Sequence, residues 1–329
     1  MFEDLKHPVP LFKSASLARE LLIIDGLARA GKGMLAPLVS NLKRVEYAQI
    51  NNPIDHFGIL WKLGHLETAT AAAYLRKIVD TKTYEQAIGR NLNTRMSDIS
   101  SVYHALDAGE VIARGTAPEG QAAMDKYDAV RRMTAYITHS NLPMIRLWLE
   151  AFPQLKMLCA ERHPIDVAAS WNSRGWGQRM GIDPLALSPV ANLDGKPTPW
   201  FAAGVAEEYA TSSPYGRIIL SLLALEELSG TAYASIPGGK RDQIRFVSFE
   251  HFVHAPMSAL SALADWLDTE VPANMPVALA RERVPRTLVL AQRRKKRDEI
   301  FANISESLAE KLYLSIQAYE SKWTLESVL

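Results

Sequence analysis

The sequence predicts an α/β protein in which a parallel β-sheet is flanked by helices. Short apolar runs typical of buried strands alternate with longer helical patterns over most of the chain. The first apolar run, 21–24, leads into a glycine-rich turn and then a helical pattern, which favours a strand–loop–helix unit. At 329 residues the chain can bury a large core, so we expect a single domain over 1–329 with an inserted lid around 175–230.

The elements follow from local composition. Runs rich in β-formers predict strands at 21–24, 44–50, 133–139, 154–160 and 243–249. Apolar spacing and alanine content predict helices from the glycine turn to about 42 and over 55–78, 121–132, 142–151, 164–172, 201–229 and 256–267, with a closing helix that ends near 322. Pro164 stands at a permitted first-turn position, and Pro214 predicts a break in the helix 201–229. The Gly-, Pro- and Asp-rich run 175–199 predicts a loop or lid.

Composition excludes several classes of function. The formal net charge of +1 gives no overall basic field for nucleic acid, and no apolar run is long enough to span a bilayer. Cys159 is the only cysteine, so an internal disulfide framework and a multi-cysteine metal site are excluded. It lies in an apolar run and is expected to be a buried residue. The segment 1–8 has no long apolar region typical of a signal peptide, and we expect a cytoplasmic protein.

The glycine turn after the first strand is the main candidate site. Gly26 and Gly31 permit a sharp turn and a close approach to a ligand, and the following helix directs free N–H groups at the loop. Arg29 and Lys32 add two cationic donors, so phosphate or sulfate is the expected guest. The stretch nearly matches the Walker A pattern, but Gly33 replaces the Ser or Thr that helps to hold Mg²⁺.

In a parallel sheet, ligands bind beyond the carboxyl ends of the strands. Four polar residues follow the predicted strands at these ends: Arg29, His139, Arg162 and Glu250. We therefore expect them to surround one binding site.

Three stretches together resemble the PAPS-dependent sulfotransferases, a P-loop superfamily with bacterial members. They are 26–33, 159–170 and 245–252, and the resemblance covers roughly residues 20 to 320. It implies a P-loop NTPase-like sulfotransferase fold. It also implies transfer of a sulfuryl group from 3′-phosphoadenosine-5′-phosphosulfate (PAPS) to a hydroxyl or amine of a small-molecule or carbohydrate acceptor, with no metal required.

The resemblance assigns residues to the two anionic ends of PAPS. The 5′-phosphosulfate loop would be Arg29, Ala30, Gly31, Lys32, Gly33 and Met34, in which Lys32 and Gly33 replace the family's two hydroxyl residues. The 3′-phosphate motif would use Arg162 and, eight residues later, Ser170. Phe249 falls where the family has an aromatic residue near the adenine. The basic run 293–297, with Arg294 and Lys295, would stand for the C-terminal basic loop, although the usual Arg-Lys-Gly is absent.

His139 is the expected catalytic base. The family often has Lys-Thr-His at this point; here Thr138 and His139 remain, and Ile137 replaces the lysine. Histidine exchanges its proton near neutral pH, which suits a general base. Lys32 would stabilise the charge that develops on the leaving 5′-phosphate.

Other interpretations remain open at the level of sequence. Arg162 could belong to a structural Arg–Asp pair, His139 and Phe249 could be core residues, and the basic run could be a solvated face. The chain could also be a P-loop small-molecule kinase, or a catalytically degenerate protein that only binds nucleotide. Trp176 and Trp200 near the predicted lid could stack a ring or could simply pack. The acceptor and the oligomeric state are not determined, and a homodimer is compatible with the sequence.

Overall fold

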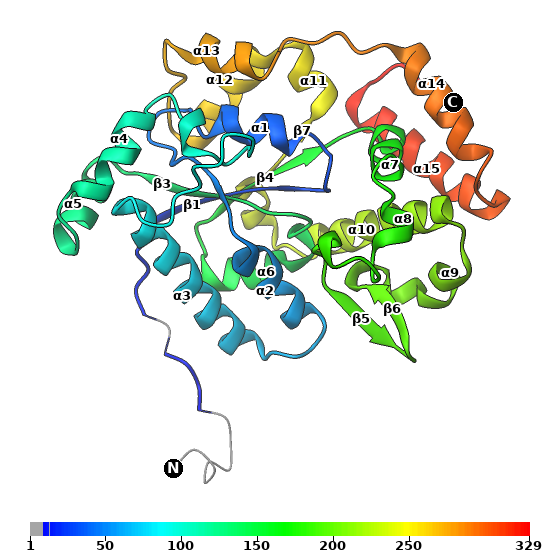
Figure 1. Cartoon of the computed structure of the whole chain (residues 1–329), viewed down its shortest axis with the longest axis horizontal. Coiled ribbons are helices and arrows are strands. Elements are labelled where there is room, and N and C mark those ends of the chain that lie inside the picture. Colours follow the sequence, from blue (N-terminus) through cyan, green and yellow to red (C-terminus); the bar gives the residue numbers. More distant parts are fainter. Residues whose placement is uncertain (1–8, 13) are drawn as a thin grey trace.

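The protein is built around a five-stranded parallel sheet. The computed structural model describes residues 9–12 and 14–329; the segment 1–8, for which no signal peptide is expected, lies outside them. The strands lie in the order β2–β3–β1–β4–β7, and Figure 1 shows helices on both faces of this sheet. The strands are β1 (Glu20–Gly26), β2 (Gln49–Ile50), β3 (Met133–Ile137), β4 (Lys156–Glu161) and β7 (Ile244–Ser248). This order confirms the predicted fold class.

Two hydrophobic clusters, one on each face, hold helices against the sheet. The first cluster includes Ile23 and Cys159, and the second includes Ile24 and Leu158, so successive residues of β1 and β4 face opposite layers. The first layer contains α2 (Asn52–Lys62), α3 (Thr68–Ala87), α6 (Ile145–Ala151) and α10 (Pro214–Ala234). The second contains α1 (Lys32–Val39), α11 (Phe249–His254), α12 (Pro256–Leu267) and α13 (Met275–Arg281). Cys159 is buried, as expected.

The remaining elements surround these layers. They are α4 (Ala108–Ala113), α5 (Gln121–Ala129), α7 (Pro164–Asn172), α8 (Trp176–Arg179), β5 (Val190–Leu193), β6 (Lys196–Pro199), α9 (Ala206–Thr211), α14 (Leu290–Phe301) and α15 (Glu306–Trp323). Short 3₁₀ turns occupy Val102–His104, Arg114–Thr116, Leu142–Met144, Pro184–Ala186, Trp200–Val205 and Gly238–Gln243. Across the described part of the chain, none of the helices has both the length and the apolar character needed to cross a membrane.

Several predicted elements differ from the structure. The strand expected at 44–50 is reduced to β2 and a single bridge at Val45, because Arg44 has a positive φ and the backbone N–H of Ala48 donates to the Ser40 hydroxyl at 3.1 Å instead of to β3. The helix expected at 55–78 is two helices, since Gly64 adopts a left-handed conformation and Glu67 caps α3. The predicted break at Pro214 is confirmed, because α10 begins there.

The run 175–199 is more ordered than the predicted loop. It contains α8 and the antiparallel hairpin β5–β6. Asp194 and Gly195 both have positive φ at the hairpin turn, which is typical of a tight two-residue Asp-Gly connection. The basic run 293–297 precedes the closing helix as expected, but it lies within the helix α14 and does not form the basic loop that the resemblance implied.

The glycine loop between β1 and α1 requires its two glycines. Gly26 has a φ of 135°, and a Cβ atom there would lie 2.3 Å from the carbonyl oxygen of Ala160 on β4. Gly31 has a φ of 100°, and its Cβ would lie 2.4 Å from the ring of Phe249. The loop therefore packs directly on the ends of the neighbouring elements, at the point of the sheet where the chain switches from one side of β1 to the other.

We expect Gly26→Ala to destabilise the protein by about 2 kcal/mol or more, because it adds both a left-handed strain and a backbone clash. Gly230→Ala is the matched control. Gly230 lies inside α10 with open space around its Cα, so alanine there should add up to about 1 kcal/mol of stability. Urea unfolding measures both changes; equal stability of Gly26→Ala and the natural protein would contradict the loop geometry.

Candidate functional site

A cavity of about 790 Å³ opens at the carboxyl ends of the strands. Its lining comes from the glycine loop, β2 and α2, Ile99, the end of β3 and the turn after it, the segment 162–201, Leu225 of α10 and the region 249–286. Of the residues expected to bind or react, Arg29, Gly31, Lys32, Gly33, Met34, His139, Arg162 and Phe249 line this single cavity. Three of the four polar residues expected at the strand ends, Arg29, His139 and Arg162, thus lie at one cavity.

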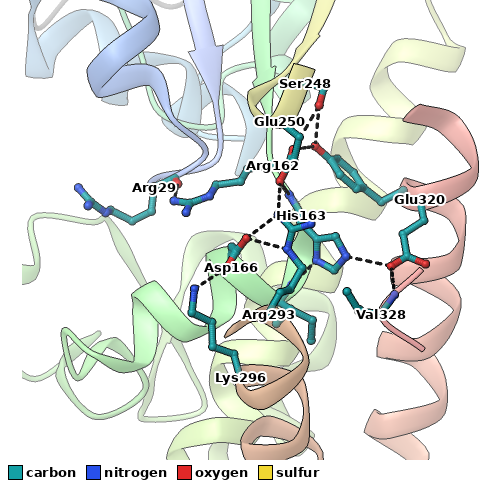
Figure 2. A network of polar contacts seen from close by, with 12 residues as sticks. Arg29, Arg162, His163, Asp166, Ser248, Glu250, Arg293, Lys296, Glu320 and Val328 are labelled. Carbon is teal, nitrogen blue, oxygen red and sulfur yellow. Dashed lines mark hydrogen bonds and ion pairs between the residues drawn. The ribbon is translucent and has the colours of Figure 1, made fainter. Parts of the chain in front are cut away.

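Two guanidinium groups share the hydroxyl of Ser170, and a third lies beside them. Arg29 donates from Nε to Ser170 Oγ at 3.2 Å, and Arg174 donates from Nη1 to the same oxygen at 3.3 Å. Arg162 donates from Nη1 to the carbonyl oxygen of Arg29 at 3.3 Å. Figure 2 shows the side chains of Arg29 and Arg162 next to each other. Burial, with the charges of Arg174 and Arg162, lowers the pKa of Arg29.

The cluster lacks carboxylate partners. Within residues 9–12 and 14–329, Arg29, Arg162 and Arg174 form no ion pair, and neither does Arg286, which also lines the cavity. The guanidinium of Arg162 lies 4.5 Å from the centre of the Phe249 ring, and its buried Nε has no hydrogen-bond partner. Concentrated positive charge with unmet donors is what an anion site requires.

The glycine loop adds a buried cation. Lys32 begins α1, is buried, and donates from Nζ to the carbonyl oxygen of Gly26. Burial lowers the pKa of Lys32 to about 8, against the opposing effect of Asp25 and Asp55. The indole of Trp171 donates to the carbonyl oxygen of Ala28 at 2.8 Å and so fixes the loop on α7.

His139 forms a pair with Asp55. Its Nδ1 lies 2.8 Å from Asp55 Oδ2, and its backbone N–H donates to Asp55 Oδ1 at 2.6 Å. The Asp55 side chain is 4% exposed, while that of His139 is 42% exposed. A carboxylate on Nδ1 favours the tautomer with a proton on that nitrogen. The other nitrogen, Nε2, is then left as a proton acceptor.

A second basic group, close to Arg162 in space but far from it in sequence, is neutralised by buried carboxylates. Figure 2 shows Arg293 of α14 between two buried carboxylates: its guanidinium lies 2.8 Å from Asp166 and 2.9 Å from Glu250. Lys296 also contacts Asp166, at 2.6 Å. Burial acts to raise the pKa of Asp166, but Arg293 and Lys296 outweigh it and the pKa lies below its ordinary value.

The same network reaches the C-terminus. Glu250 accepts hydrogen bonds from the backbone N–H of His163 at 3.2 Å and from Tyr319 at 2.6 Å. The His163 ring caps α7 and contacts Glu320, which also accepts from the backbone N–H of Val328. Glu250 was expected to face a ligand with the other polar strand ends. The structure instead places it in this buried network (Figure 2).

Two predicted 3′-phosphate residues do not reach the cavity. Arg294 contacts the carbonyl oxygen of Ser327 and the carboxylate of Glu326, and neither Arg294 nor Lys295 lines the cavity. The reason is that the basic run is helical. Neighbouring side chains of α14 therefore point in different directions around the helix axis, and those of Arg294 and Lys295 point away from the cavity. Two other predicted residues, Ser170 and Ala30, do not line the cavity. The Ser170 hydroxyl accepts hydrogen bonds from Arg29 and Arg174, and Ala30 is buried within the glycine loop.

Sequence reasoning missed three residues of the site. Asp55 lies 84 positions before its partner His139, so no local spacing relates them. Arg174 lies four residues after Ser170 and one helical turn away, which is a signal that could have identified it. Arg286 follows Pro285 in a segment with no regular structure. In the described ranges, no group of three or more His, Cys, Asp or Glu side chains could hold a metal ion.

Comparison with known proteins gives structural likeness only. No model of a known protein family matches the chain. No curated protein matches it either. A sulfotransferase domain from the curacin biosynthetic pathway has a TM-score of 0.49 and 12% identity, and the match covers 93% of this chain and 98% of that one.

Two further solved structures are similar over most of their length. The sulfotransferase domain of an olefin synthase from Synechococcus has a TM-score of 0.44 and 12% identity, with 96% of this chain and 98% of that chain covered. A sulfotransferase from Alicyclobacillus acidocaldarius has a TM-score of 0.41 and 16% identity, with 91% and 96% covered. Likeness at these values carries no argument about activity, which has to come from the site.

We expect Arg293→Met to destabilise the protein by about 3–5 kcal/mol, because it leaves Asp166 and Glu250 buried without their shared cation. Arg294→Met, one position along the same helix, removes only an exposed contact and should change the unfolding free energy by less than about 1 kcal/mol. Chemical denaturation of both variants makes the comparison. A small effect at Arg293, equal to that at Arg294, would show that the buried network does not hold α14.

Proposed function

We propose that the chain is a PAPS-dependent sulfotransferase that transfers a sulfuryl group to a hydroxyl or amine of an acceptor, with His139 as the general base. The observation that carries the proposal is that one cavity contains both a cluster of unpaired cations beside a phosphate-type loop and a His–Asp pair. The sequence motifs around Arg29 and Arg162 support the same activity. We further propose that the chain acts as a single domain in which the segment 175–230 covers the acceptor side.

The cation cluster fits a nucleotide that is anionic at two points. Gly31, Lys32 and the N-terminus of α1 suit the 5′-phosphosulfate, because free N–H groups and the buried ammonium favour negative charge there. Arg162, with Arg29 and Arg174 beside it, suits a 3′-phosphate, because these guanidinium groups form no ion pair among the described residues and Arg162 and its two neighbours line the cavity. A 3′-phosphate site of this kind would favour PAPS over ATP.

In this mechanism the chain positions the reactants and moves one proton. The donor supplies the sulfuryl group, and the electron pair of its S–O bond leaves on the 5′-phosphate. His139 takes the proton of the acceptor hydroxyl or amine at Nε2 while the acceptor atom bonds to sulfur. Asp55 holds the imidazole in the required tautomer and stabilises the imidazolium that forms. Lys32 and the loop N–H groups stabilise the negative charge that develops on the leaving phosphate.

The nucleotide assignment is tested by calorimetry with 3′,5′-adenosine bisphosphate (PAP), the product nucleotide. Arg162→Ala removes a charge-assisted contact of about 1.5–3 kcal/mol, so we expect PAP affinity to fall by about 10–100-fold. Arg294→Ala is the matched control, because it removes the same side chain outside the cavity and should leave the affinity unchanged. A thermal-shift comparison of PAP with Mg-ATP separates a sulfotransferase from a kinase, since the ligand of the native state raises the melting temperature. Stabilisation by Mg-ATP but not by PAP would favour the kinase.

The base assignment is tested by turnover with labelled PAPS. We expect His139→Ala to lower kcat by about 10²–10⁴-fold, with PAP affinity retained. Asp55→Asn should also lower kcat, because an amide that donates to Nδ1 reverses the tautomer. Near-natural turnover of His139→Ala would remove His139 from the role of base. Retained PAP binding without transfer in the natural protein, over a broad acceptor panel, would indicate a protein that binds nucleotide without catalysis.

A further inference from the structure

The cavity is divided by the plane of the sheet into two parts with different chemistry. Met34, Ile99 and Phe249 belong to the hydrophobic cluster on the α1 side, next to the glycine loop. The opposite wall belongs to the cluster on the α2 side and is formed by Ile59, Trp176, Met180, Trp200, Phe201 and Leu225. Ile59 lies one helical turn after Asp55 on α2, so this apolar wall continues from the His139–Asp55 pair.

Polar groups are few on this wall. Outside the cation cluster and the His139–Asp55 pair, the lining from α2 and from the segment 176–201 offers as side-chain hydrogen-bonding groups only Asn52, His56, Ser188 and the indole N–H groups of Trp176 and Trp200. A carbohydrate presents hydroxyls over its whole surface and needs a matching set of partners, because unpaired buried polar groups are unfavourable. This part of the lining therefore offers few partners for the hydroxyls of a sugar.

The tryptophans near the cavity do not provide a flat stacking platform. Trp171 is buried, is tilted at 48° to Trp176, and uses its indole N–H on the carbonyl oxygen of Ala28. Trp200 is buried and packs edge-on against Phe201. Trp171 and Trp200 therefore form the buried back of an apolar wall and have no free face for a sugar, and only the half-buried Trp176 leaves part of its ring at the cavity.

The mouth of the same wall exposes large apolar side chains. Leu185 and Leu187 line the cavity yet are 75% and 66% exposed, and they lie between α8 and β5, next to each other at the open side of the site. Exposed leucines beside a cavity are unfavourable in water and become favourable when an apolar ligand covers them. Together with the wall behind, they make one apolar surface that runs from solvent to the candidate base.

We propose that the acceptor is an apolar molecule, with an alkyl or aryl body, that carries its reacting hydroxyl or amine at one end. This inference rests on the proposed function and names the substrate class of that site. The apolar body lies along the wall and beneath Leu185 and Leu187, and the single polar end meets Nε2 of His139. As in the proposed reaction, the acceptor oxygen or nitrogen bonds to sulfur, the proton goes to His139 and the electron pair of the broken S–O bond leaves with the nucleotide.

The test uses the full chain saturated with PAP, so that binding is measured without turnover. Calorimetry and thermal shift are recorded with n-hexanol, n-octanol and n-decanol, and with glucose and N-acetylglucosamine. We expect affinity to rise by a factor of about 3–4 for each added methylene, since each buries more apolar surface, and we expect no measurable binding of the two sugars. With labelled PAPS, kcat/KM for the same alcohols should rise in the same order.

Variants of the apolar wall test whether the dependence of affinity on alcohol chain length arises there. The double change Leu185→Asn and Leu187→Asn should flatten the dependence on chain length and leave PAP affinity unchanged; asparagine tolerates the positive φ of Leu187. Ile182→Asn is the matched control, because Ile182 is 74% exposed on the same segment but does not line the cavity, and it should retain the dependence.

The outcomes separate this inference from the proposed function. Binding of the sugars in preference to the alcohols, or no alcohol binding to a protein that binds PAP normally, would overturn the apolar acceptor and leave the donor assignment standing. Equal loss in the double variant and in Ile182→Asn would also overturn it. Failure of the natural protein to bind PAP at all would instead overturn the proposed function.

Discussion

The candidate site depends on one buried carboxylate at the end of the central strand. Asp25 is fully buried and accepts hydrogen bonds from the Thr138 hydroxyl at 2.9 Å and from the backbone N–H groups of Asn141 and Leu142 at 2.9 and 2.8 Å. A buried charge is tolerated only when such donors satisfy it, so these bonds fix the turn after β3 against β1. The amide of Asn141 then donates to Asp55 at 2.8 Å, and Asp55 orients His139. The position of the candidate base is therefore determined by the strand that leads into the glycine loop.

The basic residues near the site form two groups. One group is paired with buried carboxylates, and the other has no carboxylate partner in the part of the chain that the structure describes. Arg293 and Lys296 are paired with buried carboxylates, and their positive charge serves to join α14 to α7 and α11. Arg29 and Arg162, which Figure 2 draws beside this network, have no carboxylate partner among the described residues. Charge alone does not distinguish a binding arginine from a structural one, but the presence of a buried counter-charge does.

The sequence was sufficient where local chemistry decides the structure. The glycine loop and the helices 164–172 and 256–267 were predicted at their observed bounds, because proline, glycine and apolar spacing act over a few residues. Long-range packing decided what the sequence did not reveal. Asp55 meets His139 only because α2 packs beside the turn after β3. The assignment of Arg294 to the site was wrong, because the side of a basic helix that faces the cavity depends on which carboxylates pack against that helix. The hairpin at 190–199 does have a local sequence signal, because Asp194-Gly195 is a dipeptide typical of a tight hairpin turn.

The arginines of the candidate site are oriented by neutral groups, and this explains how the site keeps its charge. Arg162 is held by a backbone carbonyl and by the face of Phe249, and Arg29 and Arg174 share the Ser170 hydroxyl. A carboxylate would fix these side chains as firmly, but it would also cancel the attraction for an anion. Neutral acceptors and an aromatic face restrict the side-chain rotamers without that cancellation. The cost is mutual repulsion: burial first, and then the charges of Arg174 and Arg162, lower the pKa of Arg29. An anion that binds between these groups removes that repulsion, so part of its affinity is already stored in the folded protein.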